Sequence, residues 1–289
     1  MKGRIGLFYF SGTGNTEIIA GLLEKELTRT GHAVESIRIE DVLNGRAACN
    51  PDDFDLIGIG GPVLAFSAPR IVLKFIKALP RAKGKKMFIF RTAGGVAQQN
   101  YSASASMIRR ARRKGYDVFY ERLFSLGSNW VMRFDDEITR RLYDADVRKV
   151  EIMCRDLAEG RSRFPEAPFS ARALSASMAL AAKLIVPLAA KDYSVRKECT
   201  LCGICVKKCP MGNIQVKRDR IRFGFSCTWC LRCIYACPKR AIAPRLFSFI
   251  MIKEGYDPHA ILKGREPRKD LSGIMVPRFF DAYVGDDAL

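Results

Sequence analysis

The sequence predicts an α/β protein, in which a doubly wound sheet of five parallel strands is joined to a second, smaller α+β domain. Short apolar runs alternate with helical stretches over residues 2–160, the pattern of a parallel sheet. Eight of the ten cysteines lie within residues 199–237. The chain has 289 residues, enough for two domains of the usual size of about 100 to 150 residues.

The alternation can be followed element by element. Strands are expected at residues 4–10, 33–39, 54–60, 86–92 and 117–126, and helices at residues 16–30, 69–78, 103–114 and 135–159. Five strands linked in this way fit the order 2-1-3-4-5. In that order a crevice forms beyond the carboxyl ends of the first and third strands.

The turn after the first strand has the composition of a phosphate-binding loop. It consists of Ser11, Gly12, Thr13, Gly14, Asn15 and Thr16. Backbone N–H groups and hydroxyls at the start of a helix can surround a phosphate, and the helix dipole favours the negative charge. The chain has no G-x-x-x-x-G-K-[ST] loop and no G-x-G-x-x-G turn, so a mononucleotide with a terminal phosphate is expected. A helix-capping turn is the structural alternative.

The cysteine-rich segment contains the motif C-x2-C-x2-C-x3-C-P twice. Every cysteine of the first copy recurs 28 positions later, so the segment is an internal duplication. Three thiolates of each copy can bind one cubane cluster, while the fourth reaches the cluster of the other copy. The expected ligands are Cys199, Cys202, Cys205 and Cys237 for one [4Fe-4S] cluster, and Cys227, Cys230, Cys233 and Cys209 for the other.

A zinc site is the alternative for these thiols, but zinc sites use isolated C-x2-C pairs rather than two triplets with a fourth cysteine before proline. Clustered thiols without a secretion signal indicate a reducing compartment, and we expect the cytoplasm. The other two cysteines, Cys49 and Cys154, have no partner spacing and are expected to be ordinary side chains.

The chain resembles a known family at these motifs. Residues 7–23 resemble the flavodoxin signature at Leu7, Phe8, Tyr9, Ser11, Gly14, Thr16, Ala20 and Leu23. With the cysteine segment, residues 1–246 resemble the flavodoxin-ferredoxin fusion proteins, the EFR-type ferredoxin family. The resemblance implies a flavodoxin-like domain that binds FMN, with its phosphate on the loop from Ser11 to Thr16, and a bacterial-type 2[4Fe-4S] ferredoxin domain.

The resemblance also implies where the flavin ring lies, between the loops that follow the third and fourth strands. The corresponding residues are Pro62, Val63, Leu64, Ala65 and Phe66 in one loop and Thr92, Ala93, Gly94 and Gly95 in the other. Position 64, where the family often has an aromatic residue, is leucine. Phe66 is the nearest substitute, or else a core residue. Trp130 is expected either at the same crevice or under the following helix.

The charge is strongly positive, with a formal net charge of +19. Residues 201–250 contain ten Lys or Arg and one acid, so the ferredoxin segment is basic and suits acidic redox partners. Residues 109–114 form a second basic run, for which a solvated helix face is the main interpretation and nucleic-acid or anionic-membrane contact the alternative. No nucleic-acid-binding motif supports the alternative.

The expected domains are residues 1–160 for the FMN-binding region, 161–190 for a linker with an apolar helix, 191–246 for the ferredoxin, and 247–289 for an extension that wraps one of the domains. The linker helix is interrupted by Arg172, Lys183 and Pro187, which disfavours a membrane span. We expect this helix to pack between the domains.

These features favour an electron-transfer protein that passes electrons between FMN, two [4Fe-4S] clusters and external redox partners. No nucleophile and base pair is evident in the sequence. One alternative is an FMN-dependent reductase of a small substrate, fed by the clusters. A second is a redox-responsive protein that binds nucleic acid or a membrane.

Overall fold

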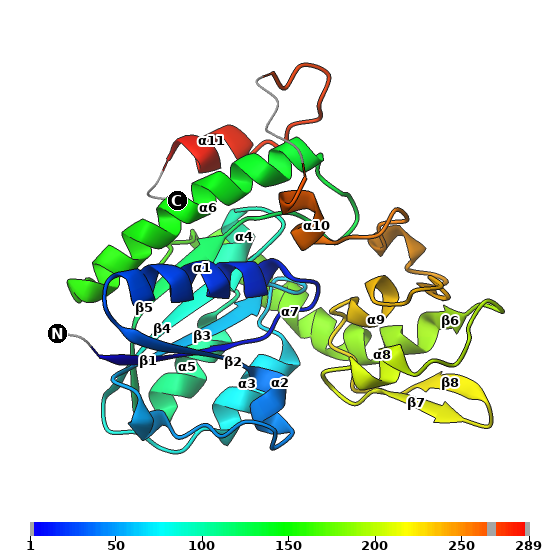
Figure 1. Cartoon of the computed structure of the whole chain (residues 1–289), viewed down its shortest axis with the longest axis horizontal. Coiled ribbons are helices and arrows are strands. Elements are labelled where there is room, and N and C mark those ends of the chain that lie inside the picture. Colours follow the sequence, from blue (N-terminus) through cyan, green and yellow to red (C-terminus); the bar gives the residue numbers. More distant parts are fainter. Residues whose placement is uncertain (1–2, 265–269, 287–289) are drawn as a thin grey trace.

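A five-stranded parallel sheet forms the centre of the larger part of the protein (Figure 1). The computed structural model describes residues 3–264 and 270–286. The strands are β1 (Arg4–Tyr9), β2 (Ala33–Arg38), β3 (Leu56–Pro62), β4 (Lys85–Thr92) and β5 (Tyr116–Phe124). They lie in the order β2-β1-β3-β4-β5, which confirms the predicted order 2-1-3-4-5.

The central strands are buried on both faces, as expected for a parallel sheet covered by helices. In β3, two glycines leave room for aromatic rings of the neighbouring strand. A Cβ atom on Gly58 would overlap the ring of Phe88, and one on Gly60 would overlap the ring of Phe90. Large rings from β4 therefore fill the space that the glycines leave.

Helices cover the two faces of the sheet, and each face has its own core (Figure 1). The helices α1 (Asn15–Arg29) and α6 (Asp136–Ala158) pack together on one face, and α3 (Arg70–Ala78) and α5 (Ala105–Arg113) on the other. The short helices α2 (Ile39–Leu43) and α4 (Gln98–Tyr101) were not expected from the sequence. Single turns of this kind are too short to produce a periodic pattern.

The duplicated cysteine segment forms a smaller unit, which we call the cysteine module (residues 193–244). It contains two antiparallel pairs, β6 (Tyr193–Val195) with β9 (Ile242–Pro244), and β7 (Ile214–Lys217) with β8 (Arg220–Phe223). The helices α8 (Ile204–Lys207) and α9 (Arg232–Tyr235) lie 28 positions apart, like the cysteines. Each is preceded by a residue with positive φ, 73° at Gly203 and 57° at Leu231, so the duplication extends to the backbone.

A long helix, α7 (Phe169–Ala189), links the two parts. It contacts α4 at one end and the 3-10 turn η2 (Ala190–Asp192) at the other. The helix was expected to pack between the domains, but most of its large apolar side chains are exposed. The side that faces the rest of the protein carries mainly small residues, and Val186 near the end of the helix packs on the cysteine module.

The segment after the cysteine module returns to the sheet. Its helices α10 (Pro258–Leu262) and α11 (Phe280–Gly285) both contact α6 (Figure 1). The hydroxyl of Tyr283 donates a hydrogen bond to Asp146 and accepts one of 3.0 Å from the backbone N–H of Ser125. Burial raises the pKa of the Asp146 carboxyl to about 7. The extension is thus anchored in the core beside α6 and is not a free tail.

Candidate functional site

The predicted phosphate loop lies between the end of β1 and the first turn of α1. Its shape is set by a hydrogen bond of 3.0 Å from the backbone N–H of Gly14 to Ser11 Oγ, and by the positive φ of Gly14, 116°. The hydroxyls of Thr16 and Thr92 are 2.7 Å apart, which ties the loop to the end of β4. The loop is therefore held in one conformation by its own side chains and by the sheet.

The backbone amides of this loop fit a phosphate group. In residues 3–264 and 270–286, the N–H groups of Gly12, Thr13, Asn15 and Thr16 have no hydrogen-bond acceptor. They stand at the N-terminus of a helix of 15 residues, where the helix dipole favours an anion. Unsatisfied amides at this position are the donors that a terminal phosphate requires.

The crevice beside this loop brings together two further predicted segments. It is lined by the phosphate loop except Gly14, by Pro62, Val63 and Leu64 after β3, and by Thr92, Ala93 and Gly94 after β4. Ala65, Phe66 and Gly95 are not among the lining residues; a Cβ on Gly95 would instead meet the ring of Phe279 at 2.9 Å. Phe66 is half-buried and lies outside the crevice.

The open space in this crevice is small. Its volume is about 30 Å³, whereas pockets for cofactor-sized ligands usually measure about 300 to 1,000 Å³. The amides fit the phosphate, but a flavin ring needs the loops after β3, β4 and β5 to separate. The structure therefore describes a closed arrangement of this site.

Residues distant in sequence close the crevice. Asn129, after β5, donates a hydrogen bond of 2.8 Å to Thr13 Oγ1. The side-chain amide of Asn15 donates a hydrogen bond of 2.8 Å from Nδ2 to the carbonyl of Gly127. Its Oδ1 accepts a hydrogen bond of 2.6 Å from the hydroxyl of Tyr256. The loop after β5 and the C-terminal extension are thus both hydrogen-bonded to the phosphate loop.

The cysteine module docks on the same loop through one arginine. The Arg232 guanidinium donates to the carbonyls of Ser11 at 2.5 Å and Gly12 at 3.3 Å, and pairs with the buried carboxylate of Glu40 at 2.7 Å. Cys230, two residues earlier, lines the crevice itself. One half of the cysteine module is therefore in direct contact with the predicted FMN site.

The first predicted ligand set is assembled at the other side of the module. Cys199, Cys202, Cys205 and Cys237 line one small cavity, closed by Ile221 and Ile242 among other residues. The backbone N–H of Ala241 donates to Cys237 Sγ at 3.3 Å. Amide hydrogen bonds to sulfur are typical of iron-sulfur sites, where they tune the reduction potential.

The second predicted set is also gathered, in a more buried position. Burial raises the pKa of the Cys233 thiol, and the nearby sulfurs of Cys230, Cys227, Cys209 and Cys205 raise it further. The other three members of the second set therefore lie near Cys233, together with Cys205 of the first set. Burial raises the pKa of the Cys227 thiol to about 12. Thiols of this kind become thiolates only when metal binding compensates the charge and releases the protons.

Hydrogen bonds to the second set resemble those to the first. The backbone N–H of Asn213 donates to Cys209 Sγ at 3.2 Å, and that of Trp229 donates to Cys227 Sγ at 3.3 Å. Among the described residues no group of three His, Cys, Asp or Glu side chains forms a site for a single metal ion. The first cysteine set lines a cavity, which leaves space between its sulfurs, as a cluster with several irons requires.

Two tryptophans connect the sheet to the cysteine module. Trp130 contacts Trp229 edge to face, with ring centroids 5.1 Å apart, and Trp229 lies between two predicted ligands in C-T-W-C. Trp130 was expected at the crevice or under the following helix; instead it packs on the module. Cys49 and Cys154 pack in the two cores of the sheet, as expected for ordinary side chains.

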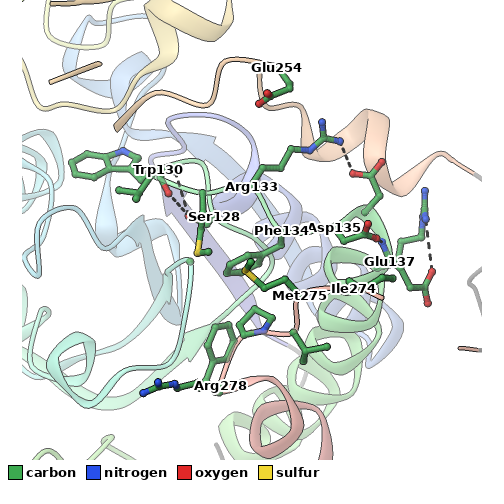
Figure 2. A pocket seen from close by; sticks show the side chains of 18 of the residues that line it. Ser128, Trp130, Arg133, Phe134, Asp135, Glu137, Glu254, Ile274, Met275 and Arg278 are labelled. Carbon is green, nitrogen blue, oxygen red and sulfur yellow. Dashed lines mark hydrogen bonds and ion pairs between the residues drawn. The ribbon is translucent and has the colours of Figure 1, made fainter. Parts of the chain in front are cut away.

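A larger cavity of about 1470 Å³ lies beside the crevice (Figure 2). Gly94 and Ser128 lie on its wall, so it begins where the crevice ends. Figure 2 shows Trp130, Phe134, Ile274 and Met275 around it, together with Arg133 and Glu254. The walls are therefore apolar with charged residues at several points.

Comparisons with known proteins identify both parts. Residues 7–120 match the family model of a flavodoxin domain, and residues 191–244 match that of a 4Fe-4S dicluster domain. The flavodoxin of Megasphaera elsdenii is 35% identical over 96 residues, which cover 31% of this chain and 65% of that protein's length.

Solved structures of flavodoxins resemble the N-terminal part. The solution structure of two-electron reduced Megasphaera elsdenii flavodoxin has 31% identity and a TM-score of 0.34, and the match covers 41% of this chain and 84% of that one. Oxidised Flavodoxin 2 from Bacillus cereus has 20% identity and a TM-score of 0.39, with 54% of this chain and 99% of that one covered.

The chain thus joins a flavodoxin domain to a 4Fe-4S dicluster domain. This confirms the predicted flavodoxin-ferredoxin fusion. The flavodoxin domain implies FMN, and the dicluster domain implies iron-sulfur clusters. Both kinds of domain are typical of soluble electron carriers, and one apolar helix among the described residues is long enough to cross a membrane.

Substitution of Gly12 tests the contact between the phosphate loop and the module. A Cβ atom there would lie 2.7 Å from the carbonyl oxygen of Cys230 and 3.1 Å from its Cβ. We expect Gly12→Ala to lower the free energy of unfolding by about 1 to 3 kcal/mol, because the extra methyl forces the two backbones apart. Anaerobic denaturant unfolding of the protein with its cofactors measures this.

The matched control is Gly21→Ala on the exposed side of α1, where a Cβ would meet nothing within 4 Å. Because alanine favours a helix over glycine, this change should be neutral or stabilise the protein by up to about 1 kcal/mol. Equal stability of the Gly12→Ala and Gly21→Ala proteins would contradict the close packing at the loop.

Proposed function

We propose that this protein passes electrons between FMN and two [4Fe-4S] clusters, and between these groups and external redox proteins. The observation that carries the proposal is the contact of Cys230 with the FMN crevice. A cluster ligand that lines the flavin site gives a short path between the two redox groups. Arg232 keeps this path short, because its guanidinium attaches the module to the phosphate loop.

The proposed FMN site consists of the phosphate loop with the two loops that line the crevice. The amides of Gly12, Thr13, Asn15 and Thr16 would bind the phosphate, and residues 62–64 and 92–94 would flank the ring. For the clusters we propose the crossed sets, with Cys237 completing the first triplet and Cys209 the second.

The two cluster sites differ in exposure, which supports an electron path that runs from the flavin site through the buried cysteine set to the exposed set. Cys230 of the second set is buried against the flavodoxin domain, whereas Cys202 of the first set is exposed. When bound, FMN exchanges one or two electrons and each cluster exchanges one. The second cluster would then be the inner redox centre, beside the flavin, and the first would be the outer redox centre, which faces a partner.

The expected partner is a redox protein with an acidic docking surface. Lys207, Lys208 and Lys239 are exposed near the outer cysteine set, and no acidic residue occurs between Cys199 and Arg218. Positive charge around the outer site would steer an acidic partner towards it, and association should slow as ionic strength rises. We propose the cytoplasm for this exchange, since clustered cysteines that bind metal indicate a reducing compartment.

Cofactor analysis is the direct test of this function. After anaerobic purification or reconstitution we expect about eight irons, about eight acid-labile sulfides and about one FMN per chain. The measurement is chemical analysis of iron and sulfide with absorption spectroscopy of released flavin. Full cluster content without bound flavin would refute the coupling of the two groups and leave the ferredoxin function intact.

Arg232 provides a test of the internal path. In Arg232→Ala protein that retains its iron and flavin, electron transfer from the flavin to the clusters should slow by about tenfold to a hundredfold, because the two sites lose their fixed separation. Stopped-flow bleaching of the cluster absorption after rapid flavin reduction measures this rate. The variant Arg232→Lys keeps the charge but loses the simultaneous hydrogen bonds of the guanidinium. Its transfer rate should lie between those of the unchanged protein and Arg232→Ala.

Lys239→Ala is the matched control for Arg232→Ala, since it removes one positive charge from the module at an exposed position beside the first cysteine set. Its internal transfer rate should equal that of the unchanged protein. If Arg232→Ala transfers electrons internally as fast as Lys239→Ala, Arg232 does not position the module.

A second candidate function is reduction of a small substrate by FMN with the clusters as electron supply. The cavity of about 1470 Å³ favours it, because its wall includes Gly94 at the crevice and the apolar side chains in Figure 2. A cavity of this size exceeds that of most small-ligand pockets. Trp130 and Phe134 would suit an apolar, planar substrate.

Ile274→Trp, which fills part of this cavity, tests the reductase function with benzoquinone as the acceptor. We expect the KM to rise about tenfold, a usual effect of lost fit in an apolar pocket, while flavin-to-cluster transfer stays unchanged. An unchanged KM and kcat would show that the acceptor is reduced elsewhere, and the carrier function alone would remain.

A further inference from the structure

The long helix α7 has its small residues towards the protein and its large apolar residues towards the outside. On the side that faces the protein, Ala171, Ser175 and Ala189 are buried. The hydroxyl of Ser175 donates a hydrogen bond of 2.5 Å to the carbonyl of Gln99, which fastens this side to α4. In an ordinary surface helix the large apolar residues would occupy the inner side.

Large apolar side chains occupy the outer side instead. Phe169 is 82% exposed and Leu184 is 70% exposed. The other exposed members are Leu174, Met178, Leu180, Ile185 and Leu188. An extended row of exposed apolar side chains is unusual on a water-soluble surface and marks an interaction site. The helix is long and apolar enough to cross a membrane, and only 22% of its most apolar stretch is buried inside the protein.

The row continues past the end of the helix onto the cysteine module. The ammonium of Lys191 lies 4.2 Å from the ring centre of Phe225, which is exposed. The carboxylate of Asp192 accepts a hydrogen bond of 2.9 Å from the backbone N–H of Leu246, whose side chain is 81% exposed. Separate segments thus meet at the end of α7 and extend one apolar surface, which we call the α7 face.

Positive charge predominates along the α7 face. Arg172, Lys183 and Lys191 lie in residues 167–191, which contain no acid, whereas Arg161 is paired with Asp156 and Glu159. Asp192 is already committed to backbone N–H groups of residues 245–247. Because the whole chain carries +19, two copies would repel each other, whereas anionic lipid headgroups would attract this face.

We propose that the α7 face docks the protein on the surface of an anionic lipid bilayer. The helix lies in the interface, with the large apolar side chains among the acyl chains and the flanking Lys and Arg at the headgroups. It does not cross the bilayer, because its inner side is fastened to the protein at Ser175 and its outer side carries Arg172 and Lys183. Docking would bring the electron carrier close to redox partners in the membrane.

Vesicle flotation of the intact, cluster-loaded protein tests this proposal. We expect binding to vesicles of phosphatidylcholine with phosphatidylglycerol, much weaker binding to phosphatidylcholine alone, and loss of binding as salt is raised. The double variant L184E/L188E should weaken partitioning by about a hundredfold, since two apolar side chains leave the interface. Both leucines are exposed, so the fold should be retained, as circular dichroism can verify.

The matched control is the double variant M132E/M275E, which introduces the same two negative charges at exposed apolar residues outside the α7 face. It should bind the anionic vesicles as the unchanged protein does. Equal loss of binding in both variants would overturn the proposal, as would the absence of vesicle binding. A dimer in size-exclusion chromatography that L184E/L188E dissociates, without vesicle binding, would assign the α7 face to a second copy instead.

Discussion

The contact of Arg232 with the phosphate loop fixes the relation between the two redox parts of the molecule. The guanidinium lies over the ring of Phe10 at 5.3 Å and is hydrogen-bonded to two carbonyls of the loop and to Glu40. Both charged groups are largely buried, so each depends on the other for compensation. This attachment holds Cys230 at the crevice, while the hydrogen bonds of Asn129 and Tyr256 bring two further segments against the phosphate loop.

The parts of the structure that depend on local patterns could be predicted from the sequence. The five strands and the four longer helices of the flavodoxin domain lie within about two residues of their expected positions, a usual accuracy for element ends. The loop after β1 and the duplicated cysteine spacing are likewise local features, and Cys199, Cys202, Cys205 and Cys237 line one cavity. Such features can be predicted from the hydrophobic periodicity of each segment and from the spacing of residues that are close in the sequence.

Contacts between distant segments could not be predicted. Glu40, which lies in α2 between β2 and β3, pairs with Arg232. Tyr256, from the C-terminal extension, donates a hydrogen bond to Asn15 of the phosphate loop. No sequence motif marks either residue. The packing of Trp130 on Trp229 and the outward face of α7 depend likewise on how the two parts dock. One signal was present: the duplication has Arg232 where its first copy has Ile204. This difference distinguishes the half that docks from the half that faces outward.

The covering of the phosphate loop has a consequence for nucleotide exchange. The loop is covered by Cys230 and by Pro258, whose ring would touch a Cβ placed on Gly14. These two residues belong to the cysteine module and to the C-terminal extension, which follow the flavodoxin domain in the chain. A nucleotide bound at this loop would therefore leave slowly, because both segments would have to move away from it first.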